Sequence, residues 1–89
     1  MIENKVTIIN KLGLHARAAA KLVSTASGFS SKIKVAFNGK DVDGKSIMSV
    51  MMLAASKGCE LTIKVDGDDE AVAMAAVLNL INNRFDEDE

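Results

Sequence analysis

The chain is organised around one stretch, Lys11-Leu12-Gly13-Leu14-His15-Ala16-Arg17-Ala18-Ala19-Ala20, which holds the only histidine of the 89 residues. Alanine has the highest helix propensity, so the alanines predict a helix that begins at Ala16 with His15 near its N-cap. Gly13 permits the bend that must precede such a helix. The stretch therefore predicts a junction between a strand and a helix, with an imidazole at the amino end of the helix.

The predicted position of His15 at a helix N-terminus would stabilise an anionic group bound to its side chain. The first N–H groups of a helix lack intrahelical partners, and the helix dipole adds partial positive charge there. A phosphoryl group on His15 would lie in this field, which also disfavours the imidazolium form and leaves a nucleophilic lone pair. The amide of Ala16 and the guanidinium of Arg17 could bind the same phosphate. From spacing alone, however, a histidine beside a helix terminus is more often a capping or surface residue.

Periodicity predicts the other strands and helices. Alternating apolar residues and the Asn38-Gly39 hairpin signal predict strands at residues 6–9, 32–37, 40–42 and 60–65. Apolar stripes predict helices at residues 16–27, 47–55 and 69–85, with Gly28 after the first and with Ser46 and Asp68 as caps of the others. Asp69 and Glu70 would complement the dipole of the last helix. This order is typical of an α+β fold, a four-stranded antiparallel sheet with three helices on one face.

The helix at 47–55 has more apolar residues than one buried stripe can use. If Val50, Leu53 and Ala54 face inward, three side chains are left as a flexible apolar patch: Ile47, Met48 and Met51. On pattern alone, burial of all of them in the core is the better prediction. A second predicted surface lies on the first helix. Arg17 and Lys21 are four residues apart on one flank, which could contact an acidic partner.

Composition disfavours several classes of protein. A net charge of −1 at pH 7 argues against a broad nucleic-acid-binding surface. The absence of a long apolar run and of a signal-peptide pattern predicts a cytoplasmic protein with no membrane insertion. Cys59 is the only cysteine and is expected to be an apolar filler, so no cofactor and no metal site are expected. We expect one domain over residues 1–89, with residues 86–89 as a solvated acidic tail.

Two separated motifs give the chain a specific resemblance. Gly13-Leu14-His15-Ala16-Arg17 before a helix of small residues, together with Gly44-Lys45-Ser46-Ile47-Met48, resembles the HPr family of the bacterial phosphotransferase system. The likeness runs nearly end to end, and it implies an open-faced β-sandwich with the order βαββαβα. We expect a monomer.

The resemblance implies a role for each motif. His15 would accept a phosphoryl group on Nδ1 from an enzyme I-type donor charged by phosphoenolpyruvate, and would pass it to A-type components, with Arg17 and the Ala16 amide stabilising the phosphate. The helix beside the histidine would dock these partners through Ile47, Met48 and Met51, aided by Lys21 and Lys45. Ser46 needs no role beyond capping, but an HPr kinase/phosphorylase modifies the matching serine in some branches of the family.

Departures from the family pattern favour its nitrogen-related branch, NPr. Ala18 stands where sugar-transport members usually have proline, and Ser24 and Ser27 stand where they often have lysine. Two other functions remain open: a regulatory binding module that acts through Ser46 and the apolar helix without histidine phosphotransfer, and a small metal carrier. The second would need paired thiols in the first loop, where this chain has Leu14 and His15. A self-sufficient enzyme is the least favoured alternative because no catalytic cluster accompanies the single histidine.

Overall fold

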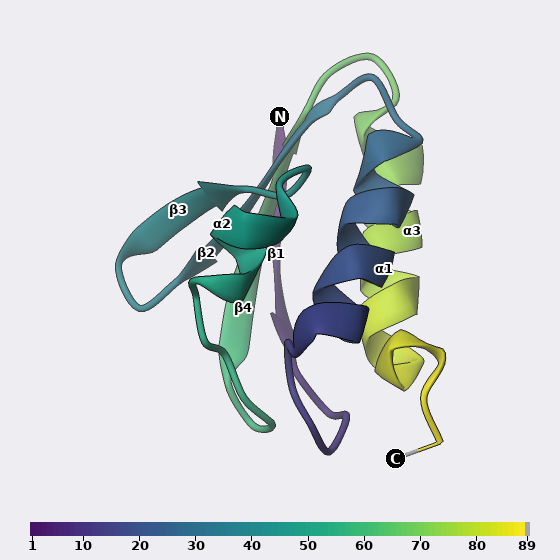
Figure 1. The fold of residues 1–89 in the computed structure, drawn as a ribbon. Coiled ribbons are helices and arrows are strands. Elements are labelled where there is room, and N and C mark those ends of the chain that lie inside the picture. Colours follow the sequence, from purple (N-terminus) through teal and green to yellow (C-terminus); the bar gives the residue numbers. More distant parts are fainter. Residues whose placement is uncertain (89) are drawn as a thin grey trace.

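Residues 1–88 are described by a computed structural model of the chain. Within them, four strands form one antiparallel sheet in the order β1-β4-β2-β3 (Figure 1). The strands are β1 (Ile2–Thr7), β2 (Lys32–Phe37), β3 (Lys40–Asp43) and β4 (Glu60–Asp66). The predicted sheet is confirmed, with the second and third strands joined at Asn38 and Gly39, where both residues have positive φ.

The first strand lies earlier than the predicted residues 6–9. Backbone pairing with β4 sets its extent, from Ile2 opposite Val65 to Thr7 opposite Glu60. This pairing at the sheet edge does not require apolar side chains, so the polar residues before Val6 are included. Ile8 follows the strand as a fully buried residue whose N–H donates to the carbonyl of Cys59 at 2.9 Å.

The helices are α1 (Ala16–Ser27), α2 (Ile47–Met51) and α3 (Glu70–Asn82), followed by a short 3₁₀ turn, η1 (Arg84–Asp86). Helices α1 and α3 lie side by side over one face of the sheet, and α2 lies beside α1 and β3 (Figure 1). The core fills the space between these layers, where alternate residues of β4 are buried against apolar side chains of both long helices. This arrangement confirms the predicted open-faced sandwich of the βαββαβα type. None of the helices found in residues 1–88 has the length and apolar character that a membrane span needs.

Helix α2 is shorter than the predicted 47–55. Its last turn tightens to bonds of the i to i+3 type, in which Leu53 N donates to Val50 O at 3.2 Å and Ala54 N to Met51 O at 3.1 Å. Ala54 then adopts a left-handed conformation with φ of 53° and reverses the chain. Val50 and Leu53 are buried as predicted, but Ala54 is exposed and Ala55 is buried in its place.

The start and end of α3 also differ from the prediction. The N-cap is Asp69 rather than Asp68, and its side chain makes no capping bond within the helix. Its carboxylate instead accepts hydrogen bonds from Ser30 N at 2.9 Å, from Ser31 N at 3.0 Å and from the Ser31 hydroxyl. At the other end, the helix does not continue to Phe85, because that residue has a left-handed φ of 53° inside η1.

These bonds to Asp69 predict an acid-sensitive link between α3 and the turn after α1. The Ser31 hydroxyl and the Ser30 amide lower the pKa of Asp69 from its usual 3.8 to about 2. Folding therefore favours the ionised form, so the stabilisation is complete above about pH 4 and is lost as the pH falls toward about 2. We expect Asp69→Asn to lower the urea midpoint at pH 7, and we expect the difference from the wild-type chain to shrink between pH 4 and pH 2. Asp68→Asn, at an exposed neighbour, is the control and should match the wild-type chain; equal midpoints for both variants at pH 7 would contradict the prediction.

Candidate functional site

The loop that leads to His15 is held by backbone contacts with the segment after α2. Leu14 N donates to Ala55 O at 3.0 Å, and Gly58 N donates to Ile8 O at 2.8 Å. Gly13 has φ of +68°, and a Cβ there would lie 2.7 Å from Ser56 Cα and 2.8 Å from Ala55 O. Only glycine fits both this conformation and this close approach. The bend predicted from Gly13 is therefore present, and it fixes where α1 begins.

His15 is the N-cap residue of α1, as the sequence predicts. Its backbone is extended (φ −72°, ψ 177°), and its carbonyl accepts the first intrahelical bond from Ala19 N at 2.9 Å. The imidazole makes no capping bond and is 28% exposed. The amides of Ala16 and Arg17 precede the first intrahelical bond, so they belong to the set that a helix leaves without partners of its own. The side chain therefore stands at an electropositive terminus and remains accessible.

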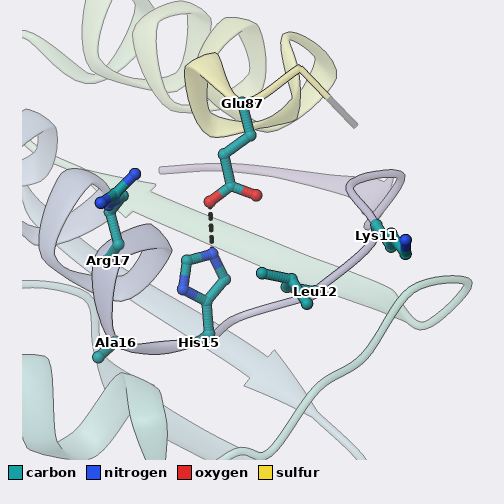
Figure 2. Close-up of a pocket in the computed structure, with 6 residues that line it drawn as sticks. All are labelled: Lys11, Leu12, His15, Ala16, Arg17 and Glu87. Carbon is teal, nitrogen blue, oxygen red and sulfur yellow. Dashed lines mark hydrogen bonds and ion pairs between the residues drawn. The ribbon is translucent and has the colours of Figure 1, made fainter.

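The imidazole opens onto a surface pocket that collects charged groups from three parts of the chain. The lining residues, all drawn in Figure 2, come from the first loop, the start of α1 and the C-terminal segment: Lys11, Leu12, His15, Ala16, Arg17 and Glu87. The pocket thus brings together His15, Ala16 and Arg17, as the first motif predicts. Lys11, Leu12 and Glu87 were not predicted to belong to it.

Glu87 corrects the prediction of a solvated tail. Its side chain is only 14% exposed, and its carboxylate contacts two groups of the first loop. One oxygen accepts from Asn10 Nδ2 at 3.1 Å, and the other is hydrogen-bonded to Nε2 of His15 (Figure 2). Burial by itself raises the pKa of Glu87, but the hydrogen bonds from Asn10 and His15 and the charge of Lys21 outweigh it, so the pKa lies below its usual value. Of the predicted tail, Asp86 belongs to η1, and position 89 lies outside the described residues.

The two lysines that we expected at a partner-binding surface make contacts within the chain. The Lys21 ammonium donates to Phe85 O at 2.9 Å and lies 4.0 Å from the Asp86 carboxylate. The Lys45 ammonium donates to Phe29 O at 2.7 Å. Lys21 therefore links α1 to η1, and Lys45 links the loop before α2 to the turn after α1. The sequence spacing did not indicate either contact.

Ser46 and the apolar residues after it lie where the sequence places them. Ser46 caps α2, and its hydroxyl accepts from Ser49 N at 3.3 Å. Ile47, Met48 and Met51 are 43%, 73% and 40% exposed. Met52 at the end of α2 is also exposed, at 71%, and so is Leu12 in the lining of the histidine pocket, at 67%. The exposed apolar side chains of α2 and of the first loop are therefore more numerous than predicted.

Glu87 could not have been found from a local pattern. It lies 72 residues from His15, and the run of acidic residues around it is typical of a solvated terminus. The available signal was indirect: Phe85 ends the apolar stripe predicted for the last helix, and a large side chain that is fully buried holds the following residues near the fold.

Comparison with known proteins gives a consistent result. Residues 2–83 match the family model described as "PTS HPr component phosphorylation site". The phosphocarrier protein HPr of Cupriavidus necator is 57% identical over 89 residues, which cover 100% of both chains. The crystal structure of HPr-C-His from Thermoanaerobacter tengcongensis superimposes with a TM-score of 0.96 at 46% identity and covers 100% of both chains. A structure titled an HPr dimer from the same organism gives 0.79 at 47% identity, covering 98% of this chain and 100% of that one.

These relatives are named HPr, and their names do not distinguish the nitrogen-related branch. The family model nevertheless spans nearly the whole chain, and the identity to a relative of equal length is high. The chain therefore belongs to the HPr family, the phosphocarrier proteins of the phosphotransferase system, which act within a phosphotransfer relay and not as stand-alone enzymes.

Proposed function

We propose that His15 is the residue that carries the phosphoryl group and that its Nδ1 atom forms the bond to phosphorus. The observation that carries this proposal is the orientation of the ring at the start of α1. Nε2 is occupied by the carboxylate of Glu87, while the other ring nitrogen points to the side of the pocket where Ala16 and Arg17 lie (Figure 2). An accessible nitrogen next to amides without intrahelical partners and next to a guanidinium suits the binding and transfer of a phosphoryl group.

The transfer needs only a positioned nucleophile and charge stabilisation. The lone pair of Nδ1 attacks phosphorus while the bond from phosphorus to the donor breaks, and the electron pair of that bond stays with the donor. The Arg17 guanidinium and the first amides of α1 stabilise the phosphoryl oxygens before and after the step. In the second half of the relay, the electron pair of the N–P bond returns to Nδ1 as the acceptor takes the phosphoryl group. We propose an enzyme I-type donor charged by phosphoenolpyruvate and A-type acceptors, with the carrier acting as a cytoplasmic monomer.

We also propose that the donor and the acceptors dock on the exposed apolar residues of α2. Helix α2 packs beside α1, so a partner seated on Ile47, Met48 and Met51 would reach the pocket at the amino end of α1. Methionine side chains are flexible and suit a surface that must bind several partners. This supports the docking role implied by the family resemblance, whereas Lys21 and Lys45 are better explained by their contacts within the chain.

The His15 assignment predicts the outcome of a labelling reaction. The chain is mixed with phosphoenolpyruvate carrying labelled phosphate and with either a sugar-type or a nitrogen-type donor enzyme, and label on the chain is followed with time. We expect His15→Ala to incorporate no label, and we expect Arg17→Ala to be slower by about tenfold or more because it loses charge-assisted hydrogen bonds. We expect the nitrogen-type donor to be faster, given Ala18, Ser24 and Ser27. Label retained by His15→Ala would refute the assignment, and a faster sugar-type donor would refute the branch.

The docking role predicts that acidic residues on α2 slow the transfer without unfolding the chain. In the double variant Met48→Asp, Met51→Asp, the substituted side chains are 73% and 40% exposed in the wild-type chain, so the fold should be retained. We expect the initial rate of labelling to fall by roughly tenfold, since apolar contact is replaced by charge that needs desolvation. Val72→Asp on α3, at a side chain that is 63% exposed, is the control and should label at the wild-type rate. A folded double variant with an unchanged rate would rule out docking at these residues.

Regulation at Ser46 is a proposal that rests on the resemblance, and its N-cap position makes it testable with matched variants. Asp and Asn both cap helices well, so Ser46→Asp and Ser46→Asn should fold alike and differ in charge. We expect Ser46→Asp to label several-fold more slowly, because the negative charge lies beside the docking residues, and we expect Ser46→Asn to resemble the wild-type chain. Identical donor kinetics for the two variants would count against regulation by phosphorylation at this serine.

A further inference from the structure

The C-terminal segment reaches the functional site through Glu87, whose contact with Nε2 leaves Nδ1 as the accessible ring nitrogen but which has no role of its own so far. We propose that Glu87 is a positioning residue for His15: its carboxylate holds the hydrogen of the ring on Nε2 and so directs the lone pair of Nδ1 toward the phosphate side of the pocket. The proposal rests on the proposed function of His15 and adds a residue that acts through the imidazole without contacting the phosphoryl group.

The carboxylate is held from more than one side. Its second oxygen accepts from Asn10 Nδ2, and the same Nδ2 donates to Gly13 O at 2.8 Å. Asn10 is fully buried, so its side chain is a fixed part of the loop that precedes His15. The bend at Gly13 and the carboxylate of Glu87 are thus linked through one amide group. This network sets the position of Glu87 relative to the ring.

The backbone before Glu87 is shaped to bring it back to the ring. Arg84, Phe85 and Asp86 are consecutive residues with φ of 56°, 53° and 62°. The left-handed region is unfavourable for residues with a side chain, and such conformations persist where the surrounding structure enforces them. Here the side chain of Phe85 is fully buried and its carbonyl accepts from Lys21, so this turn is anchored to both the core and α1. The contact between Glu87 and His15 is therefore built into the fold.

The carboxylate suits both directions of the transfer. When Nδ1 forms the bond to phosphorus, Nε2 keeps its hydrogen and the ring gains positive charge. A carboxylate on Nε2–H offsets this charge and requires no proton to move. When the group leaves, the electron pair of the N–P bond returns to Nδ1, and the ring is again an imidazole with its hydrogen on Nε2. A second group that orients a functional imidazole in this way is a common feature of histidine sites.

Two measurements on one set of variants test the proposal. Glu87→Ala removes the acceptor, Glu87→Gln keeps an oxygen but not the charge, and Asp88→Asn removes a charge from the same segment at an exposed position. In proton and nitrogen NMR spectra of the His15 ring, we expect the wild-type chain and Asp88→Asn to show a resolved Nε2–H signal protected from exchange with solvent. We expect that signal to be lost in Glu87→Ala. We expect labelling by the donor to be slower by roughly tenfold in Glu87→Ala and to take an intermediate value in Glu87→Gln.

The outcomes separate this proposal from the proposed function. A wild-type chain that takes no label would overturn both. A wild-type chain that labels normally, with Glu87→Ala equally fast and with the same ring signal, would overturn only the role of Glu87. If Glu87→Ala lowered the urea midpoint but left the ring signal and the labelling rate unchanged, Glu87 would have a purely structural role and the proposal would also fail.

Discussion

The placement of His15 depends on the close backbone contact between the first loop and the segment that follows α2. Leu14 donates to the carbonyl of Ala55, and the missing side chain of Gly13 lets the loop approach Ser56 and that same carbonyl. Because these contacts hold the loop against this segment, α1 begins at Ala16, and its first two residues line the pocket. The same segment follows α2 in the chain, so this contact also relates the position of the imidazole to the exposed apolar residues of α2.

Charge at the site is balanced within a small area. On the proposed function, Arg17 and the amino end of α1 would favour an incoming phosphate, and the Glu87 carboxylate contacts the ring nitrogen that does not face them (Figure 2). The guanidinium would then act on the phosphoryl oxygens, and the carboxylate on the charge that develops in the ring. A donor and an acceptor must both be able to use such a site, so neither the free nor the phosphorylated ring should be strongly favoured. Opposing charges on the two sides of one imidazole meet this requirement.

The parts of the fold with a clear period could be predicted from the sequence. The bounds of α1 follow from its alanines and Gly28, and the alternation in β2 and β4 gives their buried faces. The end of α2 could not be predicted, because an unbroken apolar run does not show that Ala54 adopts a left-handed conformation. Asp69 was recognised as acidic at a helix start, but its bonds to Ser30 and Ser31 depend on how α3 packs beside the turn after α1.

The site divides in the same way between local and distant residues. His15, Ala16 and Arg17 are neighbours in the sequence, so a short motif is enough to group them. Glu87 reaches the ring only because the chain turns back after Phe85, and residues 86–89 resemble a solvated terminus in composition. Contacts of this kind are set by the core that anchors the turn, and local periodicity carries no information about them.

The central claim is that the Nδ1 atom of His15 carries the phosphoryl group. Phosphorus and nitrogen NMR of the chain, after phosphorylation by phosphoenolpyruvate and a donor enzyme and at a pH where phosphohistidine persists, locates the bond directly. The account predicts a single phosphorylated residue, His15, with the N–P bond at Nδ1 and the ring hydrogen on Nε2. A bond at Nε2, or a phosphoryl group found only on another residue, would contradict it.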